Sequence, residues 1–347
     1  MPYQLCILGC GTMGVAILSG VLDNLSFPNS AHDQNPNANN AGETGPSTPM
    51  GSLILDPSNP DSLPDRFIAT VNRSESAKKL RRTFRDHGPL GSTVQVVQSD
   101  HNTTSVASSS VILLCCKPQM ASSLLQATGM YKALQGKLLI SILAGTTISQ
   151  YREWVPKSCT VVRAMPNTPS KIREGMTVLS SLSPSDPETP KNRDILLALF
   201  TPLGRCRFMD EKVDFISLPR RYLSLQLTHS LSSLGNQHFD AVTAVCGSGP
   251  AFVCLVLEAI ADGGVMMGLP RSEALELAAQ TMQGAARMVL QTGMHPAALK
   301  DSVTTPGGCT IAGLLALEDG RVRSTVARCI QATALHAAGL GQSAVNK

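Results

Sequence analysis

QLCILGCGTMG, residues 4–14, joins an apolar run to three closely spaced glycines. The run predicts a short buried strand at 4–9, and the VAILSGVL that follows predicts a helix to about residue 25. Strand, glycine turn and helix in this order form a dinucleotide-binding fingerprint, because glycines let the backbone approach a diphosphate and the helix N-terminus offers free N–H groups. A plain tight turn is the alternative. The residues expected to contact the dinucleotide are Gly9, Gly11, Thr12, Met13 and Gly14.

Beyond this turn, apolar runs alternate with helical or polar stretches. They predict strands at 66–71, 93–97, 111–116, 137–143 and 160–165. The alternation indicates an α/β fold with a parallel, doubly wound sheet. Ligands of such sheets bind at the carboxyl ends of the strands, so we expect Cys116, Lys117 and Pro118 on the nicotinamide side. For Lys117, a surface lysine is the alternative.

The second predicted strand ends in Asn72-Arg73-Ser74. Sites that prefer NAD place an acidic residue at this point to bind the ribose hydroxyls. Arg73 can instead pair with a 2′-phosphate and Ser74 can donate a hydrogen bond to it. We therefore expect NADPH, with NADH possible. We interpret the basic run that follows as a solvated helix face, with at most a secondary electrostatic contribution to the phosphate: Lys78, Lys79, Arg81, Arg82 and Arg85.

Composition bounds the remaining possibilities. The 347 residues are 43% hydrophobic and 16% charged, an ordinary globular balance. A net charge of +4 and 4% aromatic residues give no reason to expect a nucleic-acid or membrane-surface partner. The ten cysteines form no C-x-x-C pair, and no histidine joins them at metal spacing, so we expect buried reduced thiols and no metal. The richest apolar run, Ala244–Leu269, contains Glu258 and Asp262, so we expect no membrane span and a cytoplasmic protein.

From about residue 239 the pattern becomes helical. A helix from Gly249 is apolar nearly all round and is expected to be buried. The next helix is expected to have Ser272 as its N-cap and to end at Gly293. The last helix is expected at about 321–339. Before it, Pro-Gly-Gly at 306–308 leads into TIAGLLALE, which predicts a second helix N-terminus able to bind an anion.

Six motifs follow one another along the chain: LGCGTMG, Lys117-Pro118-Gln119, RAMPNTP (163–169), EGMTV (174–178), FDAVTAVCGSGPAF (239–252) and LKDSVTTPGGCTIAGLLALE (299–318). In these motifs the chain resembles the pyrroline-5-carboxylate reductase family. The resemblance implies a Rossmann domain at 1–212 with two extra strands near 177–180 and 206–209, then an all-α domain at 238–347 that interlocks into homo-oligomers. It implies reduction of 1-pyrroline-5-carboxylate to L-proline by NAD(P)H, the last step of proline biosynthesis.

The resemblance also implies roles for single residues. The substrate carboxylate is expected on the backbone N–H groups at the second helix start, and Thr310 is expected to hydrogen-bond the ring nitrogen. Asn102 is expected at the adenosine ribose and Asn167 at the nicotinamide. Ser248 and Gly249 either support the active site or cap a helix. The substrate set is Thr305, Gly307, Gly308, Cys309 and Thr310, and the catalytic pair is Thr310 and Lys117.

No Asp, Glu or His presents itself as an obligatory general acid, so the proton comes from water or the imine binds already protonated. Catalysis by the Cys309 thiol is not expected, because hydride transfer needs no nucleophile.

Two segments are surplus to the family pattern. Residues 26–65 are rich in Asn, Pro, Ser and Gly, which predicts a disordered surface insertion. Residues 213–237 separate Asp210-Glu211-Lys212 from HFDAVTA, which family members join directly. We hypothesise that these 25 residues are a translated intron; a genuine lineage-specific loop is the alternative.

Two other functions stay open at this point. One is a different NADP-dependent reductase of the same architecture, acting on a ketoacid or hydroxyacid. The other is a protein that binds NADPH without catalysis, either as a redox sensor or as an enzyme inactivated by the 213–237 segment. Turnover of NADPH with pyrroline-5-carboxylate separates these possibilities.

Overall fold

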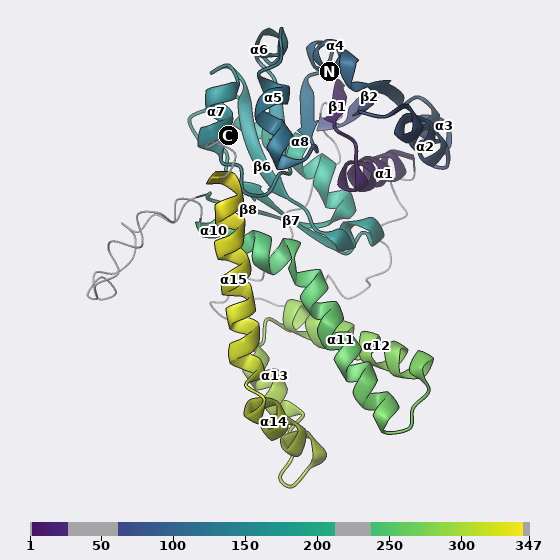
Figure 1. Ribbon diagram of the computed structural model, residues 1–347, viewed down its shortest axis with the longest axis vertical. Helices are drawn as coiled ribbons and strands as arrows, with labels where there is room; N and C mark the ends of the chain where they lie inside the picture. The colour runs from purple at the N-terminus through teal and green to yellow at the C-terminus, as the bar shows by residue number, and fades with distance from the viewer. Residues whose placement is uncertain (1, 27–61, 212–236, 343–347) are drawn as a thin grey trace, which may run out of the picture. The chain divides into compact units, whose positions relative to one another are not determined.

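The computed structural model describes residues 2–26, 62–211 and 237–342 (Figure 1). The described residues form two compact units. One is Ser248–Thr333, and the other contains the remaining described residues. The first unit along the chain thus continues through Gly247, beyond the boundary expected at residue 238. Most of the surplus segments expected at 26–65 and 213–237 lies outside the described residues.

One eight-stranded sheet organises the N-terminal unit, in the order β3-β2-β1-β4-β5-β6-β7-β8. All the predicted strands are present, including the two extra ones: β1 (Tyr3–Leu8), β2 (Pro64–Val71), β3 (Gln95–Gln98), β4 (Val111–Leu114), β5 (Leu138–Ser141), β6 (Thr160–Met165), β7 (Gly175–Ser180) and β8 (Gly204–Met209). The parallel sheet expected from the first six strands is confirmed, since all neighbours among β1 to β6 are parallel. The extra strand β7 is antiparallel to β6. Only the 3-10 turn η4 (Thr168–Ile172) links them, and a parallel pair needs a longer crossover.

Helices accompany the strands of this unit: α1 (Thr12–Ser26), α2 (Ser74–Arg85), α3 (Gly88–Ser92), α4 (Asn102–Ala107), α5 (Ala121–Leu125), α6 (Met130–Ala133), α7 (Ile148–Trp154), α8 (Thr189–Phe200) and α10 (Gln237–Val242). Short 3-10 and π turns complete it: η2 (Ser99–His101), η3 (Pro118–Met120), η5 (Thr201–Leu203) and η8 (Thr243–Gly247).

Alternation along the central strands gives the sheet two buried faces. Leu5 and Ile7 of β1 belong to one core cluster, whereas Cys6 and Leu8 belong to the other. β1 is hydrogen-bonded to both β2 and β4. The segments that follow β1, β2 and β4 therefore emerge together at the carboxyl edge of the sheet, where the sequence places its cofactor residues.

The remaining helices are α11 (Gly249–Met266), α12 (Arg271–Thr292), α13 (Pro296–Ser302), α14 (Cys309–Asp319) and α15 (Val322–Gln342). The predicted end of α12 is confirmed by Gly293, which has φ +67°. The expected N-cap, Ser272, is two residues late, because the N-cap is Pro270 and Arg271 is the first helical residue. The insertion also ends earlier than expected, since β2 begins at Pro64.

The expectation that α11 is buried is wrong for the single chain. Only Ala261 of this helix is buried, and Leu255 is 67% and Met266 83% exposed. Its Cys254 thiol, expected to be buried, is exposed as well. By length and composition alone, the run His238–Met266 is long and apolar enough to cross a membrane.

Candidate active site

The turn between β1 and α1 requires glycine at its first position. Gly9 has φ +76°, and a Cβ there would lie 2.9 Å from the Cα of Cys116, two residues after β4. The backbone N–H of Cys10 donates to the Thr70 carbonyl of β2 at 2.8 Å, and that of Gly9 donates to the Thr70 hydroxyl at 3.2 Å. The turn is thus fixed between β2 and β4, as the fingerprint predicts.

Beyond Gly9, the same turn has room for a nucleotide diphosphate. A Cβ on Gly11 would meet only the Gly9 carbonyl oxygen, at 3.9 Å, so this side of the turn is open to an incoming group. The Val15 N–H makes the first helical hydrogen bond, to the Gly11 carbonyl at 2.9 Å. The preceding N–H groups of Thr12 and Met13 therefore have no acceptor within the helix. Gly14 instead packs inward, since a Cβ on it would lie 3.2 Å from the Cγ2 of Ile7. The residues present therefore fit the diphosphate of a dinucleotide.

Asn72, Arg73 and Ser74 follow β2 at the same edge. All three are exposed, and Arg73 is the N-terminal cap residue of α2 without a side-chain capping bond. Within the described residues, their side chains form no hydrogen bond or ion pair, so they are available to a 2′-phosphate.

The segment after β4 lies beside the glycine turn. Cys116 contacts Gly9, and burial raises the pKa of its thiol to about 11. Lys117 is exposed and Pro118 begins η3. Asn102, which opens α4, has a buried side-chain oxygen that finds no hydrogen-bond partner among the described residues.

Asn167 uses its side chain for the fold. Its Oδ1 accepts the Met176 backbone N–H at 2.9 Å, and its Nδ2 donates to the Cys246 sulfur at 3.7 Å. These bonds tie the segment after β6 to β7 and to η8. The expected contact with nicotinamide stays a prediction.

A buried charge cluster escaped the sequence analysis. The Arg163 side chain is 1% exposed; it donates to Glu211 at 2.6 Å, and its guanidinium lies over the Phe239 ring at 4.6 Å. Glu211 also accepts the Ile148 backbone N–H at 3.0 Å. Burial raises the pKa of Asp240, Arg163 lowers it and Glu211 raises it further. The RAMPNTP motif contains Arg163, but its partners are distant in sequence and no local pattern points to them.

Burial makes the thiols around the glycine turn unreactive. Burial raises the pKa of Cys6 and of Cys10 to about 12 and that of Cys115 well above its usual range. Reactive cysteines have lowered pKa values, so these side chains act as small apolar groups.

In the helical unit, α14 begins as predicted. Gly307 has φ +68°, and a Cβ on Gly308 would collide with the Thr305 hydroxyl, so both positions require glycine. The Gly308 N–H donates to the Thr305 carbonyl at 3.0 Å and closes the turn. Cys309 is exposed and Thr310 is half-buried at the first helical positions. The turn therefore presents backbone N–H groups and a hydroxyl together.

Comparisons with known proteins agree with these observations. Residues 236–340 match the family profile described as pyrroline-5-carboxylate reductase dimerisation, and 50–145 match that of NADP oxidoreductase, coenzyme F420-dependent. A pyrroline-5-carboxylate reductase of Lophium arboricola is 42% identical over 97% of this chain and 93% of the relative, and that of Schizosaccharomyces pombe is 40% identical over 97% and 99%.

Two solved structures share the fold. A pyrroline carboxylate reductase from Plasmodium falciparum with NADP bound has a TM-score of 0.67 at 23% identity, over 98% of both chains. One from Coxiella burnetii has a TM-score of 0.68 at 23% identity, over 98% of this chain and 99% of the other.

Proposed function

The chain belongs to the pyrroline-5-carboxylate reductase family, and we propose that the β1–α1 turn holds NADPH and the turn before α14 holds the substrate. The reaction is reduction of the cyclic imine of 1-pyrroline-5-carboxylate to L-proline, the last step of proline biosynthesis. The observation that supports this assignment best is the pair of glycine turns, each opening a helix whose first N–H groups are outside the helical pattern.

On the cofactor side, the chain supplies binding and orientation. When bound, NADPH supplies the hydride that reduces the C=N carbon. The N–H groups of Thr12 and Met13 lie at the positive end of the α1 dipole and donate hydrogen bonds to the diphosphate. Arg73 and Ser74 bind the 2′-phosphate and favour NADPH over NADH. Lys117 lies on the nicotinamide side of the sheet edge.

On the substrate side, the turn before α14 matches a small anion. Gly307, Cys309 and Thr310 offer backbone N–H groups to the carboxylate, and side chains at the two glycines would block it. The Gly308 N–H, which was expected to bind the carboxylate as well, instead donates to the Thr305 carbonyl. The Thr310 hydroxyl hydrogen-bonds the ring nitrogen as the imine becomes an amine. The proton that nitrogen gains comes from water or enters with a protonated imine.

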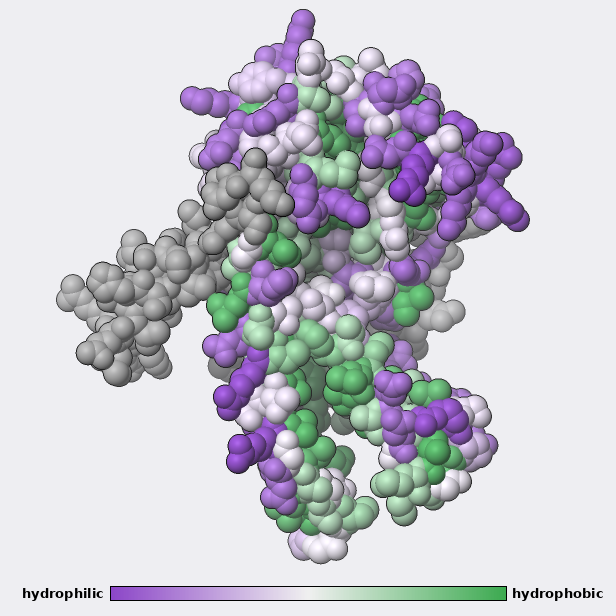
Figure 2. Space-filling view, viewed as in Figure 1, coloured by the Kyte–Doolittle hydropathy of each residue, from purple (hydrophilic) through white to green (hydrophobic). Residues whose placement is uncertain are grey.

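The helical unit assembles the enzyme into homo-oligomers, as its match to a dimerisation family indicates. Apolar side chains gather on its surface (Figure 2). Among them are Leu255 and Met266 of α11 and Leu315 of α14, each more than half exposed. A second copy that covers this surface accounts for the apolar α11 without a membrane.

A cytoplasmic location is part of the proposal. All ten cysteines are free thiols in the structure, which is typical of a reducing compartment. A fluorescent fusion of the full chain tests it, and signal confined to an organelle or a membrane contradicts it.

The activity itself is tested with the purified full chain. We expect NADPH to be oxidised when 1-pyrroline-5-carboxylate is added, with L-proline formed in equal amount. A 2-ketoacid in its place is expected to give no turnover. Binding of NADPH without turnover of the imine would instead support the sensor or inactive enzyme.

A further inference from the structure

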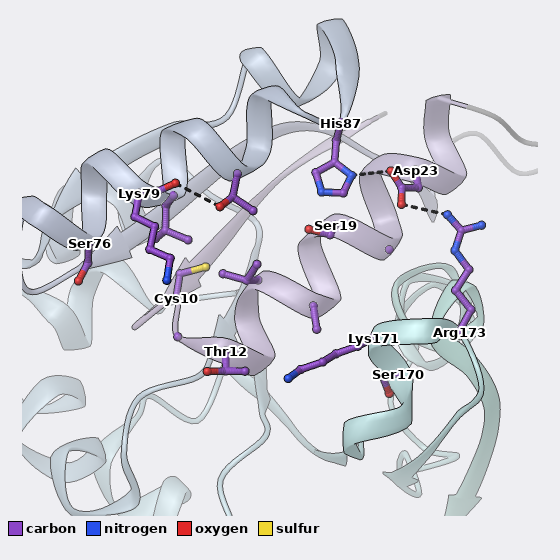
Figure 3. Close-up of a pocket in the computed structure, with 16 residues that line it drawn as sticks. Cys10, Thr12, Ser19, Asp23, Ser76, Lys79, His87, Ser170, Lys171 and Arg173 are labelled. Carbon is purple, nitrogen blue, oxygen red and sulfur yellow. Dashed lines mark hydrogen bonds and ion pairs between the residues drawn. The ribbon is translucent and has the colours of Figure 1, made fainter. Parts of the chain in front are cut away.

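A groove runs along α1 from the cofactor turn. It is a cavity of about 600 Å³ lined by residues of α1, α2 and η4 (Figure 3). At one end lie Cys10, Gly11 and Thr12 of the glycine turn, and at the other lies Asp23. The groove therefore opens at the turn that is proposed to bind the diphosphate of NADPH.

The charges in the groove are divided between its ends. Asp23, the one acidic residue among those that line it, is paired with His87 at 2.6 Å and with Arg173 at 3.0 Å. At the other end, Lys79 and Lys171 form no ion pair with any acidic side chain in the described ranges. Their positive charges are thus uncompensated beside the N-terminus of α1.

The two lysines reach this point from separate elements. Lys79 lies on α2, six residues after Arg73, on the side of the helix that lines the groove. Side chains on a helix lean toward its N-terminus, which directs the Lys79 amine back toward the end of β2. In Figure 3 this amine points toward Cys10, whereas that of Lys171, from η4, points toward Thr12.

We propose that Lys79 and Lys171 bind the phosphates of NADPH: Lys79 shares the 2′-phosphate with Arg73, and Lys171 faces the diphosphate above α1. This inference rests on the proposed function. It changes the interpretation of Lys79, which the sequence alone assigns to a solvated face. An ammonium beside a phosphate strengthens binding by charge-assisted hydrogen bonds.

The two roles predict different cofactor dependence. Lys79→Met raises the dissociation constant for NADPH about tenfold, the scale of one exposed charge-assisted contact, and leaves that for NADH unchanged. Lys171→Met raises the dissociation constants for NADPH and NADH by a similar factor, because both cofactors contain the diphosphate. Lys78→Met is the matched control; Lys78 is adjacent to Lys79, exposed and absent from the groove, so neither affinity changes.

Calorimetric titration of the full chain measures these constants without substrate, so the result does not depend on which imine the enzyme reduces. Two fragments sharpen the test, since 2′,5′-ADP contains the 2′-phosphate and 5′-AMP does not. Lys79→Met is expected to weaken the binding of 2′,5′-ADP and to leave that of 5′-AMP unchanged. Equal losses for NADPH and NADH with Lys79→Met, or no loss with either variant, overturn the proposal. Absence of imine reduction in the wild-type chain would overturn the proposed function instead.

Discussion

Removal of residues 213–237 joins Lys212 to His238 and tests whether the enzyme needs this segment. Its flanks already meet in the fold. The Asp210 carbonyl oxygen lies 3.2 Å from the Nδ1 of His238, and Glu211 and Phe239 both contact Arg163. A short connection is therefore compatible with the native positions of both ends.

The expected gain in stability follows from loop closure. The entropic cost of closing a loop grows as (3/2)RT ln n, which for about 25 residues is about 3 kcal/mol. Deletion is expected to raise the free energy of unfolding by as much as this amount, because the contacts of Arg163 on both flanks are kept.

Urea unfolding followed by tryptophan fluorescence measures this effect. Trp154 is the only tryptophan in the sequence and ends α7, the helix whose first N–H donates to Glu211. The control replaces 213–237 by a Gly/Ser segment of equal length, for which stability near that of the full chain is expected. A deletion variant that is insoluble, or less stable than the control, refutes the reasoning.

The same deletion bears on the origin of the segment. We propose that it is a translated intron, in which case the shortened enzyme reduces pyrroline-5-carboxylate at least as fast as the full chain. Sequencing of the transcript decides the origin. A main transcript that contains these codons contradicts the intron hypothesis.

Four further predictions concern the two sites and the buried cluster. Thr310→Ala is expected to lower kcat about tenfold to a hundredfold with little change in NADPH affinity, and equal losses in both count against its role. Arg73→Ala is expected to raise the KM for NADPH but not that for NADH; an unchanged cofactor preference removes it from the phosphate site. The pKa of Asp240 is raised in the fold, so its folded form holds a proton more readily than the unfolded chain. The Tm of wild type relative to that of Asp240→Asn should therefore rise as pH is lowered from neutrality toward the ordinary range of an aspartate pKa, and a constant difference contradicts this. Exposed Cys309 is expected to react with iodoacetamide far faster than buried Cys6, and L-proline is expected to slow its alkylation. No protection by proline argues against the α14 turn as the substrate site.

Local patterns in the sequence were sufficient for much of the fold and of the cofactor site. Apolar runs located the first six strands of the sheet, whereas β7 and β8 were expected only from the family resemblance. The glycine spacing located a turn whose conformation requires Gly9. The positive φ of Gly307 could likewise be anticipated, because a Pro-Gly-Gly turn before a helix admits few other conformations.

Features that depend on distant partners could not be predicted in this way. The reversal of β7 follows from the short connection that η4 makes, which no periodicity reveals. Arg163 meets Glu211 and Phe239 only through the tertiary fold. The exposure of α11 was missed because an apolar helix has the same sequence pattern whether its own chain or a second copy covers it.

Transfer of deuterium tests the central claim most directly. The full chain is incubated with 1-pyrroline-5-carboxylate and NADPH that contains deuterium at the transferable position of nicotinamide C4, and the product is analysed by mass spectrometry. We predict L-proline with one deuterium at C5, the former imine carbon. Proline without deuterium, or no proline while the cofactor remains bound, would contradict the account.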